Sequence, residues 1–92
     1  MKVGVVGVGW AGQQHIKAYA AMDGVSLIGI AGLEEDRREE LAAEFGVEHS
    51  VADWKDLLDV DGLEAISVAV PTFLHAPIAI AALERGIHVL SE

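Results

Sequence analysis

The segment VGVVGVGWAG, residues 3–12, gives the clearest indication of how this chain folds. Its first half is rich in valine, which is typical of a strand buried on both faces of a parallel sheet. Glycines follow at positions 7, 9 and 12, and a helical pattern begins among them. We therefore predict a strand, a tight turn and a helix in immediate succession.

Each of these three glycines has a predicted role in binding a phosphate group. Gly7 permits the tight turn, Gly9 lets the backbone approach a diphosphate, and Gly12 lets the helix pack closely on the strand. The amides at the start of the helix then face the anion, which the helix dipole also favours. The order of strand, turn and helix favours a dinucleotide site over a turn that only connects two elements. The predicted contacts are the backbone groups of Gly7, Val8, Gly9, Trp10, Ala11 and Gly12.

Strand and helix patterns alternate along the rest of the chain. Strands are predicted at residues 25–31, 47–51, 64–70 and 87–90, and helices at residues 11–22, 34–45, 53–58 and 74–85. Pro77 is expected in the first turn of the last helix, where proline is tolerated. The alternation predicts an α/β fold with a doubly wound parallel sheet in the strand order 3-2-1-4-5. Ligands of such sheets bind at the carboxyl ends of the strands, beside the first strand.

The composition limits the possible partners and the size of the fold. With 92 residues, the chain is one domain at most. Its formal net charge of −9 argues against binding to nucleic acid or to an anionic membrane. It has no cysteine, and its four histidines lack the spacing of metal ligands, so no metal site is expected. No apolar run is long enough to span a membrane and no signal peptide is visible, so we expect a cytoplasmic protein.

Three segments resemble the N-terminal domain of the glucose–fructose oxidoreductase / inositol dehydrogenase (Gfo/Idh/MocA) family. They are GVGWAGQQH at residues 7–15, VPTFLH at residues 70–75 and GIHVLSE at residues 86–92. The resemblance covers essentially the whole chain and implies a Rossmann domain that binds NAD or NADP. It also implies a parent enzyme that oxidises a hydroxyl group of a sugar, a polyol or a related substrate.

The resemblance also implies that residues 1–92 are an incomplete dinucleotide-binding domain. In that family a Lys-Pro pair follows the final glutamate, the lysine handles the substrate proton, and a separate C-terminal domain binds the substrate. We therefore expect no catalytic residue in this chain and no turnover by the chain alone. The alternative is a non-catalytic Rossmann module that senses a nucleotide or pairs with another protein. A different Rossmann dehydrogenase is a more distant possibility, against which the segment at residues 86–92 argues.

The preference between NAD and NADP is expected to depend on the end of the second strand. NAD-specific domains carry an acidic residue about 20 positions beyond the glycines, where this chain has Gly32. The amides of Gly32 and Leu33 precede a helix, which favours an anion. Arg37 and Arg38 are either partners for the 2′-phosphate of NADP or partners for neighbouring acids. The acids at residues 34–36 oppose a phosphate, but the missing carboxylate leads us to favour NADP.

The nicotinamide end of the site is predicted at the end of the fourth strand. The expected contacts there are Pro71, Thr72, His75 and, by the resemblance, Glu92 beside the nicotinamide ribose. Thr72 is expected to donate to the cofactor, to cap the next helix, or to do both. His75 either shapes the site or makes a structural contact. The ring of Trp10 either covers the site or packs against a partner domain.

The last predicted strand, residues 87–90, would form an edge of the sheet. It is mostly apolar, and nothing after it in the chain would cover it. Exposed apolar edges pair readily with other strands. We therefore expect the chain to self-associate through this edge or by exchange of its last elements.

Overall fold

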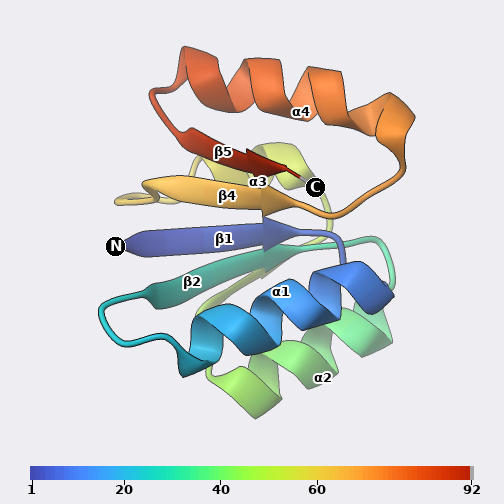
Figure 1. The fold of residues 1–92 in the computed structure, drawn as a ribbon. Coiled ribbons are helices and arrows are strands. Elements are labelled where there is room, and N and C mark those ends of the chain that lie inside the picture. Colours follow the sequence, from blue (N-terminus) through green and yellow to red (C-terminus); the bar gives the residue numbers. More distant parts are fainter. Residues whose placement is uncertain (92) are drawn as a thin grey trace.

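The structure is a computed structural model that describes residues 1–91. Within these residues a five-stranded sheet forms, and all of its neighbouring strands are parallel. The strands are β1 (Lys2–Val6), β2 (Ser26–Ala31), β3 (His49–Val51), β4 (Ala65–Val68) and β5 (His88–Ser91). Their order is β3-β2-β1-β4-β5 (Figure 1). The predicted doubly wound parallel sheet and its strand order are therefore confirmed.

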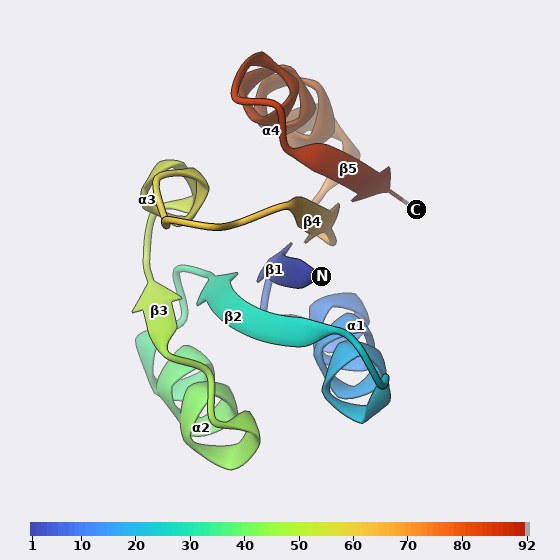
Figure 2. The same ribbon diagram turned by 90° about the vertical axis from the view of Figure 1, so that its left-hand side faces the viewer.

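Within residues 1–91, four helices cover the two faces of the sheet. Helices α1 (Trp10–Ala21) and α2 (Glu35–Phe45) lie on one face, and α3 (Trp54–Leu58) and α4 (Thr72–Glu84) lie on the other (Figure 2). Every predicted strand and helix is present, with ends shifted by no more than two residues. Left-handed glycines follow α2 and α4, with φ angles of 66° at Gly46 and 73° at Gly86, as helix termination requires.

The side chains of each strand point alternately into two apolar cores, one on each face of the sheet. Val3 and Val5 of β1 pack in the core with α1 and α2, whereas Val6 packs in the core with α3 and α4. All three side chains are at most 3% exposed. Because β1 is buried from both sides, its sequence is continuously apolar rather than alternating.

One polar pair links α1 to the sheet inside the core that contains Val3 and Val5. The hydroxyl groups of Tyr19 and Ser67 form a buried hydrogen bond of 2.5 Å between α1 and β4. Ser67 is completely buried, so its hydroxyl needs a partner within the protein. The tyrosine supplies that partner and fixes how α1 lies across β4.

The prediction that Pro77 lies in the first turn of its helix is wrong. Helix α4 begins at Thr72, directly after Pro71, so Pro77 lies inside the helix. A proline at this position removes the amide that would otherwise bond the Phe73 carbonyl. The helix starts early because the chain leaves β4 at Val68 and reaches helical geometry within four residues.

Candidate functional site

The turn after β1 is compressed at two of its glycines. Gly7 has a φ angle of 116°, and a Cβ added there would lie 2.4 Å from the carbonyl oxygen of Ala69. A Cβ on Gly12 would lie 1.9 Å from the carbonyl oxygen of Gly7. No side chain fits at either position unless the backbone moves. Helix α1 thus packs directly on the turn, in agreement with the packing role predicted for Gly12.

Gly9 lies in the same turn but has different surroundings. A Cβ added to Gly9 would meet no protein atom within 4 Å. Its backbone is extended, with a φ angle of −75°, which any residue can adopt. The packing of the chain therefore does not require glycine here. Gly9 precedes α1 as its N-cap, so the open space lies beside the first amides of that helix, which have no carbonyl partner within it.

Hydrogen bonds hold the turn to the sheet and to α1. The amide of Gly7 donates to the carbonyl of Ala31 at 2.8 Å, which ties the turn to β2. The side-chain amide of Gln13 donates to the carbonyl of Val8 at 3.1 Å. Gln13 is not among the site residues that the sequence predicted. One sequence feature could have indicated this residue. It is polar and lies four positions after Gly9, on the helix face that is directed toward the turn.

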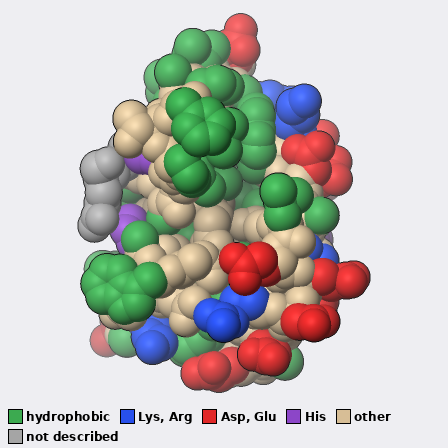
Figure 3. Space-filling model, turned by 90° about the vertical axis from the view of Figure 1, so that its right-hand side faces the viewer, with side chains coloured by type: hydrophobic (Ala, Val, Ile, Leu, Met, Phe, Trp, Pro, Cys, Tyr) green, Lys and Arg blue, Asp and Glu red, His purple; other side chains and the backbone are tan. Residues whose placement is uncertain are grey.

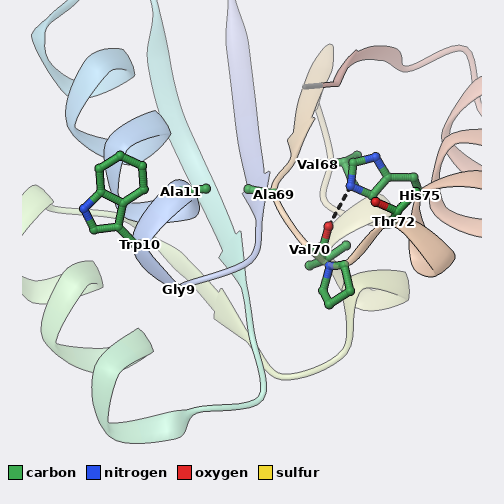
Figure 4. A pocket seen from close by; sticks show the side chains of 9 residues that line it. Gly9, Trp10, Ala11, Val68, Ala69, Val70, Thr72 and His75 are labelled. Carbon is green, nitrogen blue, oxygen red and sulfur yellow. Dashed lines mark hydrogen bonds between the residues drawn. The ribbon is translucent and has the colours of Figure 1, made fainter.

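Two hollows meet at the glycine turn, on the carboxyl edge of the sheet. The larger, of about 740 Å³, runs from the end of β2 past the turn to the segment after β4. The smaller, of about 400 Å³, lies between the start of α1 and the start of α4 (Figure 4). Gly9 and residues 69–71 line both hollows. The two hollows therefore form one path that crosses the turn.

Of the predicted site residues, six line the larger hollow and six line the smaller, with Gly9 and Pro71 common to both. The larger is lined by Gly7, Val8, Gly9, Gly32, Leu33 and Pro71. The smaller is lined by Gly9, Trp10, Ala11, Pro71, Thr72 and His75, among which Ala11 lies at the start of α1. The structure therefore brings the two predicted ends of the site to one edge of the sheet. Glu92 lies outside the described residues.

His75 braces the segment between β4 and α4. Its Nε2 lies 2.7 Å from the carbonyl oxygen of Val70, and Figure 4 shows the ring turned back toward that carbonyl. Because a carbonyl only accepts, Nε2 carries the proton. Thr72 is the first residue of α4 and Pro71 is the N-cap, so the predicted capping role of Thr72 is wrong.

The ring of Trp10 does not close the smaller hollow. The side chain is 78% exposed. Figure 4 shows it beside α1, on the opposite side of Gly9 from Thr72 and His75. Its backbone, at the first position of α1, is the part that adjoins the turn.

The backbone of Gly32 is already bonded within the sheet. Its amide donates to the carbonyl of Val51 in β3 at 3.1 Å. Its carbonyl accepts a hydrogen bond of 2.7 Å from the guanidinium of Arg38. The expectation that the Gly32 amide faces a phosphate is therefore wrong, because this amide continues the β2–β3 ladder. Leu33, which is 88% exposed, remains a candidate contact.

Arg38 is a buried structural residue. It is 6% exposed, and its Nε donates to the hydroxyl of Ser50 at 2.8 Å. Its Nη2 lies 3.3 Å from the carboxylate of Glu39. These bonds, with that to Gly32, direct the guanidinium into the protein, so Arg38 is not available to a 2′-phosphate. Arg37, one position earlier, is exposed and lines a shallow hollow with the acids of the first turn of α2.

The carboxyl edge of the sheet has an uneven surface. Figure 3 looks onto this edge and shows backbone or uncharged polar atoms near its centre, with apolar side chains above and many acidic side chains below. The acids around Arg37 are Glu34, Glu35, Asp36 and Glu40. An anion held at the centre of this edge would therefore depend on backbone amides and the α1 dipole.

Among residues 1–91, no helix has the length and apolar character that crossing a membrane requires. The same residues contain no cluster of three or more histidine, aspartate or glutamate side chains that could hold a metal ion.

The order of the strands and the glycine turn at the carboxyl end of the central strand define a dinucleotide-binding domain of the Rossmann type. Comparison with known proteins agrees with this class. Residues 1–92 match the model of the Gfo/Idh/MocA oxidoreductase family, described as an NAD-binding Rossmann fold. The chain therefore belongs to this family and is its NAD(P)-binding domain.

Individual relatives are much longer than this chain. A levoglucosan dehydrogenase from Pseudarthrobacter phenanthrenivorans is 37% identical over 100 aligned residues, which cover all of this chain and 26% of the relative. The structure of scyllo-inositol dehydrogenase from Lactobacillus casei with NAD(H) and scyllo-inositol matches with a TM-score of 0.94 and 26% identity, over 99% of this chain and 27% of that one. A 3-ketoreductase from Actinomadura kijaniata, solved with NADP, matches with a TM-score of 0.89 and 32% identity, over 99% and 28%.

Proposed function

We propose that this chain binds NAD(P) along the carboxyl edge of its sheet for a dehydrogenase that acts on a hydroxyl group of a sugar, a polyol or a related compound. The observation that carries the proposal is Gly9. Its missing side chain leaves open space beside the first amides of α1, although nothing in the packing of the chain needs that space. A diphosphate that approaches these amides accounts for it. The sugar or polyol substrate is proposed from the names of the similar dehydrogenases.

The proposed site residues fall into three groups, each of which contacts a different part of the dinucleotide. In the proposal, the backbone of residues 7–12 holds the diphosphate, and Gly32, Leu33 and Arg37 contact the adenosine end. Pro71, Thr72 and His75, with Glu92, contact the nicotinamide end. When bound, the nicotinamide accepts or returns a hydride. His75 positions this end through the Val70 carbonyl, and no side chain of this domain is assigned to proton transfer.

We favour NADP as the tighter ligand. Position 32 carries no carboxylate that would repel a 2′-phosphate. Arg37 is an exposed cation one helical turn from this position.

Calorimetric titration with NADPH, NADH and ADP-ribose tests the proposal. We expect saturable binding of all three at one site, with NADPH the tightest. A folded chain that binds none of them would overturn the proposed function. Tighter binding of NADH than of NADPH would overturn only the preference.

A further inference from the structure

Val8 and Gly32 lie next to each other at the carboxyl edge of the sheet. Val8 follows β1 within the glycine turn, and Gly32 directly follows β2. A Cβ added to Gly32 would lie 2.6 Å from Cγ2 of Val8 and 2.9 Å from its Cγ1. These separations are too short for carbon atoms in contact. The side chain of Val8 therefore fills the space that any side chain at position 32 would need.

The backbone conformation of Gly32 does not explain the glycine. Gly32 is not among the glycines with positive φ, so other residues could adopt its conformation. The backbone is also held in place, by Val51 at its amide and by Arg38 at its carbonyl. Position 32 therefore cannot turn away from Val8, and the conflict is one of space alone.

Val8 is equally unable to move aside. It is 4% exposed and belongs to the core beneath α1 and α2. Its carbonyl is bonded to the side chain of Gln13. A β-branched side chain also has few alternative rotamers. An enlarged residue at position 32 would therefore have to displace a packed and rigid neighbour.

We propose that Val8 is a specificity-determining residue, which excludes an acidic side chain from position 32. A carboxylate at this place in the fold accepts hydrogen bonds from the ribose hydroxyl groups of NAD and repels the 2′-phosphate of NADP. Val8 thus prevents this domain from acquiring the NAD type of ribose contact by a single change at position 32. The inference rests on the proposed dinucleotide binding and assigns one of its determinants.

A set of four proteins tests this coupling: the unchanged chain, Val8→Ala, Gly32→Asp and the double variant. We expect Gly32→Asp to lower the melting temperature without tighter NADH binding. The double variant should recover much of that loss. Relative to Val8→Ala, it should bind NADH about tenfold more tightly and NADPH about tenfold more weakly, as expected for one charged hydrogen bond gained and one repulsion added.

Two alanine variants at position 32, with and without Val8→Ala, separate the steric effect of a side chain from the effect of its charge. Gly32→Ala should lower the melting temperature in the unchanged chain and less so with Val8→Ala. Neither alanine variant at position 32 should alter the ratio of NADH to NADPH affinity. This pair also tests the steric part of the proposal if the aspartate variants do not fold.

The outcomes distinguish the two proposals. If the unchanged chain binds no nucleotide, the proposed function fails and this inference falls with it. If the unchanged chain binds nucleotide and Gly32→Asp alone shifts the preference to NADH as far as the double variant does, only the role of Val8 is overturned. Additive melting-temperature changes at positions 8 and 32 would also overturn it.

Discussion

At the scale of single residues, the glycines at and near the turn occupy their positions for different physical reasons. Gly7 and Gly12 are required because the chain itself occupies the space of their side chains, and Gly32 because Val8 does. Gly9 has no such neighbour. A glycine that the fold does not need is an indication of something that approaches from outside the chain.

Gly9→Ala should separate binding from folding. We expect its free energy of unfolding to stay within about 0.5 kcal/mol of the unchanged chain, because the added methyl group meets no protein atom. NADPH affinity should fall about tenfold or more, because the methyl group keeps a diphosphate from the helix amides. Urea unfolding and calorimetric titration measure the two effects.

Gly12→Ala is the matched control for this prediction. It should unfold the chain or lower its melting temperature strongly, because its methyl group would collide with the Gly7 carbonyl. Unchanged NADPH affinity in a folded Gly9→Ala protein would contradict the assigned role of Gly9.

Arg38→Met should destabilise the protein by about 1–3 kcal/mol, because a buried acceptor loses its donor. The carbonyl of Gly32 and the hydroxyl of Ser50 both lose a bond to the guanidinium. Arg37→Met removes an exposed guanidinium from the same helical turn and should change stability by less than about 0.5 kcal/mol. Denaturant titration of both variants checks the contrast, and equal effects would contradict a bracing role for Arg38.

At the scale of elements, the helices are placed by a few contacts that cross between chain segments. Helix α1 is fixed at its start by close packing on Gly7 and along its length by the bond from Tyr19 to Ser67. Helix α2 is fixed to β3 by Arg38 and Ser50. Amphipathic patterns predict that such helices exist, but only these contacts determine where they lie.

Tyr19→Phe should destabilise the protein by about 1–3 kcal/mol, because it leaves the hydroxyl of Ser67 buried without its partner. In Tyr19→Phe/Ser67→Ala both polar groups are gone, and stability should recover part of that loss. Thermal unfolding of the four proteins in this cycle measures the coupling. Additive effects would show that the hydrogen bond does not contribute to stability.

At the scale of the whole molecule, one side of the sheet ends in an edge strand with apolar surface nearby. Leu90 of β5 is 47% exposed. Ile80 and Leu83 on the outer side of α4 are 58% and 63% exposed. The position of β5 at the end of the strand order confirms that it is an edge within the described residues, as the sequence predicts.

We predict that the 92-residue chain self-associates through this edge. Sedimentation at tens of micromolar should show a species larger than the monomer. Leu90→Lys should shift the equilibrium toward the monomer, because a lysine on an edge strand resists pairing. Met22→Lys, a similar change at a distant residue that is 50% exposed, should not. A monodisperse monomer in the unchanged chain would contradict this prediction.

Much of this architecture is visible in local patterns. The valine-rich run before Gly7 predicts β1 because a strand buried on both faces needs apolar side chains on both. Gly46 and Gly86 predict the ends of α2 and α4 because helices end readily at a left-handed residue. The turn lies at the carboxyl edge because it directly follows β1, and the handedness of the crossovers decides which face of the sheet each helix covers.

The amino-acid pattern was sufficient to predict the fold class, the strand order and the glycine turn, because these depend on periodicity and on residues adjacent in the chain. The contacts of each group near the turn became known only from the packing of the strands and helices. Arg38 turns inward, the Gly32 amide joins the sheet and Val8 fills the space beside Gly32. These contacts join residues from different strands, and their distances depend on how the strands and helices pack, which no local pattern records.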